Sequence, residues 1–140
     1  MAQKKRVLFL CTGNSCRSQM AEGFLRNMAG DRFEVFSAGV KPTQINSLAI
    51  KVMAEIGVDI SKHKSKSAME FIGQQFDYVI TVCDNANQTC PIFPGKYEKV
   101  HWDLKDPAEV QGSEAERMVV FREIRNEIRQ KIEEWIKNRR

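Results

Sequence analysis

The segment from Cys11 to Ser18 reads C-T-G-N-S-C-R-S, in which five residues separate a cysteine from an arginine, Arg17. The small residues between them allow a turn whose backbone N–H groups point at one anion, and a helix that followed would direct its positive end to the same point. Helix N-termini and nearby cations favour a thiolate, so we expect Cys11 to be ionised at neutral pH. Arg17 would bind two oxygens of the anion with its planar guanidinium. The motif therefore predicts a cysteine nucleophile beneath a tetrahedral oxyanion.

The competing interpretation is a buried packing cysteine that lies beside Arg17 by chance. The order of the local signals argues against it, because the apolar run at residues 7–10 precedes the turn as a strand and a helix-like stretch follows it. A nucleotide-binding loop is excluded, since the pattern G-x-x-x-x-G-K-[ST] is absent. We expect the anion to be bound by the residues of the turn and the helix start: Thr12, Gly13, Asn14, Ser15, Cys16, Arg17 and Ser18.

Hydrophobic patterning predicts strands that alternate with helices. The expected strands are residues 6–10, 33–37, 78–82 and 100–102, and the expected helices are residues 18–28, 47–56 and a long helix from 113 onward. This pattern favours an α/β fold with a four-stranded parallel sheet covered by helices on both faces, and such sheets bind ligands beyond the carboxyl ends of their strands. Cys11 and Cys83 follow two such ends, so we expect them, and the loop that bears Asp106, at one edge of the sheet.

The last helix is expected to open with the capping box Ser113-x-x-Glu116. An apolar stripe along it should face the core, and its members are Phe121, Ile124, Ile128, Ile132 and Trp135. The charges on its outer side are interpreted as solvated rather than as a binding surface; they are Arg122, Glu123, Arg129 and Glu133.

Length and composition indicate a single globular domain over residues 1–140, with 42% hydrophobic and 29% charged residues. No apolar run approaches the ~20 residues of a membrane-spanning helix, and the basic N-terminus lacks the features of a secretory signal, so we expect a cytoplasmic protein without a membrane partner. The net charge of +4 comes from basic residues scattered among acids, which favours anion attraction and predicts no nucleic-acid partner.

The four cysteines are unsuited to structural disulfides in a reducing compartment. A zinc site is poorly favoured: Cys11 and Cys16 belong to the anion-binding turn, and the spacing Cys83-x6-Cys90 is wider than that of most zinc sites. A polar segment joins Cys83 to Cys90, and we expect it to be mobile enough for the two sulfurs to form a disulfide. The alternative for that pair is simple packing as small apolar residues, and packing is also the role we favour for Cys16.

At these residues the chain closely resembles the thioredoxin-coupled arsenate reductases, which share the fold of the low-molecular-weight protein tyrosine phosphatases. The resemblance covers nearly the whole chain and rests on C-T-G-N-S-C-R-S-Q-M-A-E-G from Cys11, S-A-G from Ser37, the segment ending at Cys83, C-P-I-F-P from Cys90, and H-W-D-L-K-D-P-A from His101. The cysteine pair favours the reductase branch, because a phosphatase needs no resolving thiols.

The resemblance implies a thiol relay with no cofactor. Cys11 would attack arsenate held by the turn and Arg17, while Asp106 donates a proton to the departing oxygen. Cys83 would then attack Cys11 and release arsenite, and Cys90 would resolve the disulfide into a Cys83–Cys90 bridge that thioredoxin reduces. On sequence alone Asp106 is also an ordinary turn residue before proline. Glutaredoxin or a small thiol remain possible reductants, and we expect a monomer.

Several members of this family bind potassium beside the turn, and three ligand positions are matched by Asn14, Glu22 and Ser37. Lys66 stands where an acidic ligand is expected, so its ammonium group would replace the ion in a vestigial site. We therefore expect no bound metal and no response of the activity to potassium.

Two other functions are compatible with the same residues. Hydrolysis of phosphotyrosine needs only Cys11, Arg17 and Asp106, but Ala108 stands where an aromatic residue would help to line a phenyl slot. Slow hydrolysis of small aryl phosphates is still expected. The second alternative is a redox or oxyanion sensor, which would stop after forming one disulfide instead of turning over.

Overall fold

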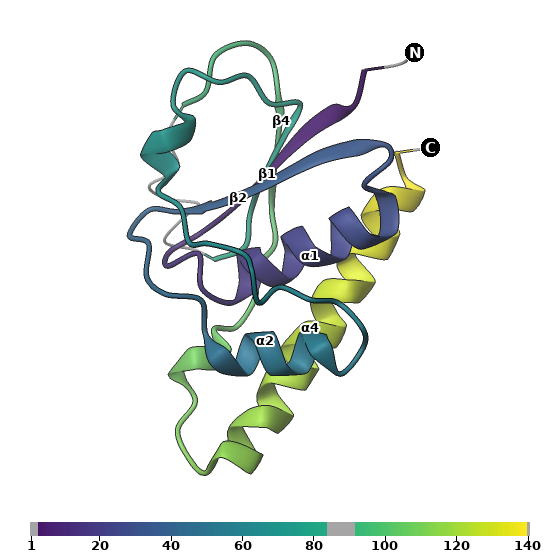
Figure 1. Cartoon of the computed structure of the whole chain (residues 1–140). Helices are drawn as coiled ribbons and strands as arrows, with labels where there is room; N and C mark the ends of the chain where they lie inside the picture. Colours follow the sequence, from purple (N-terminus) through teal and green to yellow (C-terminus); the bar gives the residue numbers. More distant parts are fainter. Residues whose placement is uncertain (1–2, 84–91, 140) are drawn as a thin grey trace.

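The computed structural model describes residues 3–83 and 92–139 of the chain (Figure 1). The elements in chain order are β1 (Lys5–Cys11), α1 (Arg17–Ala29), β2 (Phe33–Gly39), α2 (Ser47–Ala54), the 3-10 turn η1 (Ala68–Phe71), β3 (Tyr78–Thr81), β4 (Glu98–His101), the 3-10 turn η2 (Pro107–Glu109) and α4 (Glu114–Lys137). The predicted strands and helices are all present, with ends that differ by a few residues.

The four strands form one parallel sheet in the order β2-β1-β3-β4. The central strand β1 is buried on both faces: residues 7–10 have no exposed surface, which explains why they form an unbroken apolar run. The predicted α/β class with a four-stranded parallel sheet is confirmed. Because all strands run the same way, β1 and β3 deliver the residues that follow them to a common edge.

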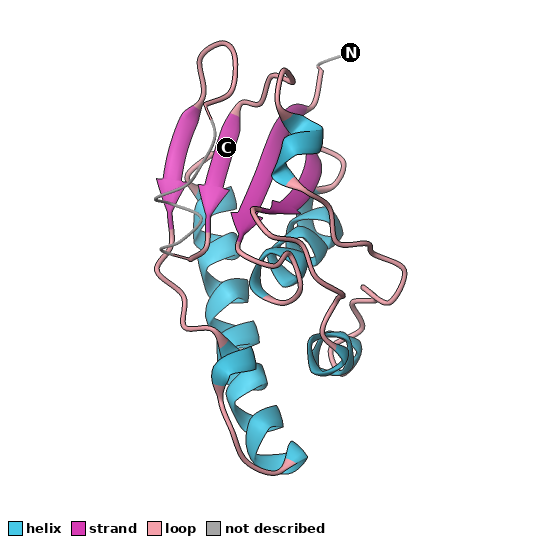
Figure 2. Ribbon diagram, turned by 90° about the vertical axis from the view of Figure 1, so that its left-hand side faces the viewer, coloured by secondary structure: helices cyan, strands magenta, loops and turns pink. Residues whose placement is uncertain are grey.

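Side chains alternate between the two faces of the sheet. On one face, Phe33 and Tyr78 pack against Trp135 of α4, with ring centroids 5.1 and 4.9 Å apart. On the other face, Phe36 lies 5.7 Å from the ring of Phe71 in η1. Figure 2 shows η1 in front of the strands and α4 behind them. Helix covers both faces as expected: within the described part of the chain, α1, α2 and α4 share one face and the short η1 packs on the other.

Helix α4 begins with the predicted capping box, in which Ser113 and Glu116 exchange hydrogen bonds. All five residues of the predicted apolar stripe are buried. The outer charges are not all simply solvated, however. Arg122 donates to both carboxylate oxygens of Glu55 next to the end of α2, at 3.2 and 2.8 Å, and lowers the pKa of Glu55 to about 2. This ion pair helps to attach α2 to α4, so α4 contributes more than its apolar stripe to packing.

The described helices do not include one that is both long and apolar enough to cross a bilayer. Helix α2 is two residues shorter than predicted, ending at Ala54. Its N-terminus is capped by Asn46, whose side chain accepts a hydrogen bond from the N–H of Leu48. This cap fixes the end of the connection that runs from β2 past the anion-binding turn.

Candidate active site

The turn between β1 and α1 has its carbonyl groups fixed from outside. The acceptors and their donors are Thr12 O from Lys41 N at 2.8 Å, Gly13 O from Thr43 N at 2.8 Å, Asn14 O from Ser65 Oγ at 2.8 Å, and Ser15 O from Asn46 N at 3.0 Å. Each peptide here is trans, so the N–H of the next residue points away from its carbonyl. The N–H groups of residues 13–16 therefore face the interior of the turn, as a chemistry of anion binding requires.

Cys11 lies at the base of this ring of N–H groups, with 2% of its surface exposed. Its sulfur accepts a hydrogen bond from the N–H of Asn14 at 3.1 Å and lies 2.9 Å from the hydroxyl of Ser18. Asn14 takes a left-handed conformation, with φ of 50°, that asparagine tolerates better than most side chains. These contacts match the prediction that Asn14 and Ser18 shape the turn and hydrogen-bond the sulfur.

The last residue of β2, Gly39, lies directly against the turn. A Cβ atom at this position would lie 2.7 Å from Thr12 O and 2.8 Å from Asn14 N. Both of these are backbone atoms of the turn, which cannot rotate away. Glycine is therefore required here so that the strand can support the anion-binding backbone at close range.

Arg17 is the first residue of α1, and no side chain caps the start of that helix. Its Nη1 donates to the carbonyl of Leu104 at 2.9 Å, and its Nη2 lies 3.6 Å from Oδ2 of Asp106. Among the residues that the structure describes, none accepts a hydrogen bond from the buried Nε. A buried guanidinium N–H without a partner is costly, and an oxyanion in the turn would satisfy it.

Asp106 serves two purposes at once. Its Oδ1 accepts a hydrogen bond from the N–H of Ala108 at 3.0 Å and so caps η2, while Oδ2 faces Arg17. The turn role and the position beside the anion site, which the sequence left as alternatives, therefore coexist.

Cys83 reaches the same edge of the sheet from β3, where Thr81 is the register partner of Leu10. Its buried sulfur lies 3.3 Å from the hydroxyl of Thr12, next to Cys11 in the chain. Cys90 lies outside the described residues. Cys16 is buried beneath the turn, and burial raises the pKa of its thiol to about 12. It is thus placed for packing, as the sequence favoured.

The residues of the expected vestigial potassium site also come together. Glu22 accepts a hydrogen bond from Ser37 and an ion pair from Arg26 at 2.7 Å, and its other close cation is Lys66, 3.9 Å from Oε1. The backbone N–H of Lys66 donates to Oδ1 of Asn14 at 2.9 Å. In this cluster the negative charge of Glu22 is matched by side chains of the protein.

Sequence reasoning missed the outer support of the turn. The carbonyl anchors lie in residues 41–46 and in Ser65, and Gln19 of α1 donates to Asn14 from a fully buried position. A buried glutamine on an amphipathic helix has a local signal, because Gln19 stands on the same side of α1 as the turn. The loop segment offers none, since its role depends on backbone atoms.

Comparison with known proteins identifies the fold family of this arrangement. Residues 6–139 match the family described as low molecular weight phosphotyrosine protein phosphatase. The chain belongs to this family. The family's defining loop is thus the one built here from Cys11 to Arg17, and the predicted resemblance is confirmed.

Within the low molecular weight phosphatase family, the similar proteins are reductases. An arsenate reductase of Halalkalibacterium halodurans is 46% identical over 129 residues, which span 92% of this chain and 93% of that protein. A solved arsenate reductase in its oxidized state has a TM-score of 0.82 at 30% identity and covers 96% of this chain and 98% of that chain. A thioredoxin-dependent arsenate reductase of Corynebacterium glutamicum has a TM-score of 0.76 at 33% identity, covering 98% of this chain and 62% of that chain.

Proposed function

We propose that this protein is an arsenate reductase that uses Cys11 as the nucleophile and thioredoxin as the reductant. The observation that carries the proposal is the anion site itself: inward N–H groups surround the Cys11 sulfur, and the buried Nε of Arg17 lacks a partner within the described chain. Arsenate and phosphate share the tetrahedral shape that this site fits. The names of the similar proteins favour arsenate as the substrate.

In the first step the Cys11 thiolate attacks arsenic(V), forming a sulfur–arsenic bond as one oxygen leaves. The carboxyl group of Asp106 is placed beside Arg17 and would protonate the departing oxygen as water. The N–H groups of the turn and Arg17 hold the three remaining oxygens.

In the second step the thiolate of Cys83 attacks the sulfur of Cys11. The sulfur–arsenic bond breaks and its electron pair goes to arsenic, which leaves as arsenite, while the two sulfurs are oxidised to a disulfide. The 3.3 Å contact between Cys83 and the hydroxyl of Thr12 supports this step, because it brings the second sulfur to the rim of the site. Cys90 would then exchange into the bridge, and a reduced thioredoxin would supply the two electrons that restore the thiols.

The test is to map disulfides after the reduced protein is mixed with arsenate and quenched with acid. We expect a Cys83–Cys90 bridge in the wild type and a Cys11–Cys83 bridge in Cys90→Ser. Cys16 should remain unalkylated at neutral pH until the protein is denatured, since burial raises the pKa of its thiol to about 12. A Cys11–Cys16 bridge, or full arsenate turnover by Cys83→Ser, would refute the relay.

A phosphatase activity is the second candidate, favoured by the family match and by the same anion site. Cys11, Arg17 and Asp106 suffice for slow hydrolysis of small aryl phosphates, and this activity should survive in Cys83→Ser because it needs no electrons. A sensor without turnover is distinguished by supplying thioredoxin, its reductase and NADPH: a reductase consumes NADPH continuously, whereas a sensor stops after one equivalent.

A further inference from the structure

Gln19 occupies a fully buried position behind the anion-binding turn, and three oxygen atoms surround the nitrogen of its side-chain amide. Nε2 lies 3.1 Å from Asn14 O, 2.9 Å from Asn14 Oδ1 and 3.0 Å from Lys64 O. Two of these atoms are backbone carbonyls, which can only accept hydrogen bonds. The orientation of the amide is therefore determined, because its reversal would place an oxygen against them.

The other end of the Gln19 amide is fixed by a histidine. Oε1 lies 2.9 Å from Nδ1 of His63, and the Nε2 atom of that ring lies 3.3 Å from Nη1 of Arg26. Since the guanidinium can only donate, the ring nitrogen that faces it accepts, and Nδ1 carries the proton that is donated to Gln19. His63 thus holds the amide in the orientation that the three oxygens require.

The same reasoning extends from Gln19 to the nucleophile. Oδ1 of Asn14 accepts from Gln19 and from the backbone N–H of Lys66 at 2.9 Å, so its Nδ2 is the donor to Ser18 Oγ at 2.8 Å. An oxygen that already accepts this bond can direct its own proton to the sulfur of Cys11, 2.9 Å away. Asn14 and Ser18 have no exposed surface, so water does not compete for these bonds.

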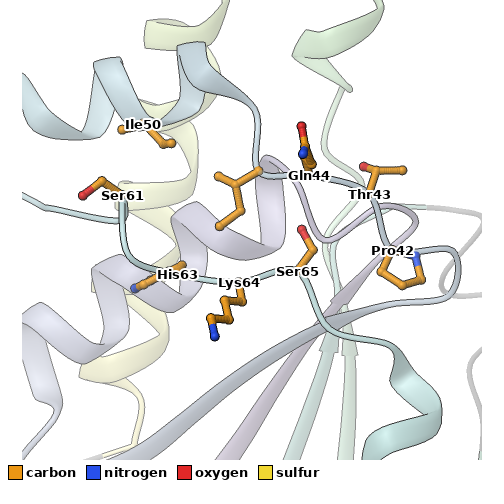
Figure 3. Close-up of a pocket in the computed structure, with 9 residues that line it drawn as sticks. Pro42, Thr43, Gln44, Ile50, Ser61, His63, Lys64 and Ser65 are labelled. Carbon is orange, nitrogen blue, oxygen red and sulfur yellow. The ribbon is translucent and has the colours of Figure 1, made fainter.

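Ser65 also donates to Asn14 O, but its surroundings differ from those of Gln19. Ser65 and His63 line a pocket of about 720 Å³ between residues 42–50 and 61–65. Figure 3 shows both side chains on the segment that forms one wall of this pocket, opposite Ile50. Water in the pocket can replace the hydroxyl of Ser65, whereas no water reaches Gln19.

We infer that Gln19 is a positioning residue for the nucleophile: its buried amide orients Asn14 and so directs the Ser18 proton to Cys11. This inference rests on the proposed role of Cys11. A sulfur that receives two fixed donors, the Asn14 N–H and the Ser18 hydroxyl, is stabilised as the thiolate. Without Gln19, the Asn14 side chain can rotate, and the Ser18 hydroxyl is no longer compelled to donate to sulfur.

The test measures the rate of Cys11 alkylation by iodoacetamide from pH 5 to 10, with peptide mass spectrometry to assign the site. Gln19→Met keeps the volume and removes both donors, and Gln19→Glu places oxygens against the three acceptors. We expect the midpoint of the pH profile to rise by about 0.5 unit or more in Gln19→Met and by about 1 unit or more in Gln19→Glu, the latter lowering the rate at pH 7 about tenfold. Matched controls are Gln130→Met and Gln130→Glu on the exposed side of α4, which should retain the wild-type profile.

Ser65→Ala should shift the profile less than Gln19→Met, because water can replace the lost donor. If Gln19→Met folds with an unchanged pH profile, or if Ser65→Ala shifts it as much, the assignment to Gln19 is wrong. If Gln19→Glu fails to fold, Gln19→Met alone decides the matter. A wild-type Cys11 no more reactive at neutral pH than free cysteine would instead refute the proposed function, so the two failures are distinguishable.

Discussion

Arg17 and Asp106 face each other across the anion site without forming a tight ion pair: Nη2 of the arginine lies 3.6 Å from Oδ2 of the aspartate. The arginine is held by its bond to the carbonyl of Leu104, and the aspartate by its bond from the N–H of Ala108. Both side chains are thus positioned by contacts outside the site. An anion that binds Arg17 meets a carboxyl group that is already in place.

Asp106→Asn should separate binding from chemistry. The amide oxygen can still accept from Ala108, so η2 keeps its cap, but the side chain can no longer transfer a proton. We expect kcat for arsenate to fall by about 10²–10⁴. Phosphate should bind at least as tightly as in the wild type, because a negative charge beside the anion has been removed. Steady-state kinetics and calorimetric phosphate titration measure the two effects.

Asp103→Asn is the matched control for this change, since Asp103 is exposed on the same connection and should leave both kcat and phosphate affinity unaltered. An unchanged kcat in Asp106→Asn would reduce Asp106 to a capping residue.

Gly39→Ala should abolish anion binding without unfolding the protein. The added methyl group would lie within 3 Å of three backbone atoms of the turn, so the turn must shift by several tenths of an ångström. Misplacement of this order in a binding site can cost about 10²-fold in activity. Phosphate binding by calorimetry and arsenate turnover should both fall by at least that order.

The control for Gly39→Ala is Gly57→Ala, at a residue with φ of 80° and open space around its Cβ. It should lower the free energy of unfolding by about 1 kcal/mol through backbone strain. Anion affinity should be retained, which separates loss of stability from loss of the site. Normal phosphate binding by Gly39→Ala would show that the turn can relax around the extra methyl group.

The sequence predicted those parts of the site that depend on residue types in short segments. The turn from Cys11 to Ser18 and the buried stripe of α4 follow from spacing and periodicity, which are local properties. The outward anchoring of the turn does not. It uses backbone N–H groups of residues 41–46, and every residue type except proline carries such a group, so no pattern marks it.

Two further features needed tertiary contacts to become visible. The charges on α4 had the spacing of a solvated face, and only the position of Glu55 at the end of α2 converts Arg122 into a packing contact. The contact of Cys83 with Thr12 was expected only as a shared sheet edge, because alternation of strands and helices fixes direction but not atomic distance.

His63 should make stability depend on pH. Burial lowers the pKa of this histidine below its ordinary value, an effect opposed by Glu22 and Asp59 and reinforced by Arg26 and Lys66. The unfolded chain therefore binds more protons than the folded protein between the lowered value and about 6.5, so the free energy of unfolding rises with pH in that window. The contribution is complete above pH 6.5 and is lost as the pH falls.

Urea denaturation of the wild type and His63→Gln from pH 4.5 to 7.5 measures this effect. The slope for the wild type should exceed that for the variant by at most about 1.4 kcal/mol per pH unit, the limit for a single proton. His101 is present in both proteins, so its titration cancels in the comparison. Parallel curves for the two proteins across the whole range would contradict the depressed titration.

Potassium should not stimulate the enzyme. The carboxylate of Glu22 is already paired with Arg26 at 2.7 Å and approached by Lys66 at 3.9 Å, and Asn14 Oδ1 accepts two N–H donors. A cation would have to displace these charges and bonds to enter. We expect kcat/KM for arsenate to agree within about twofold in potassium, sodium and choline chloride at one ionic strength without sulfate, because an ion that is not bound stabilises nothing. Lys66→Met provides the comparison: it removes one of the two cations beside Glu22 and should make potassium binding more favourable than in the wild type. A marked rise in kcat/KM of the wild type with potassium alone would show that the ion competes successfully with the lysine.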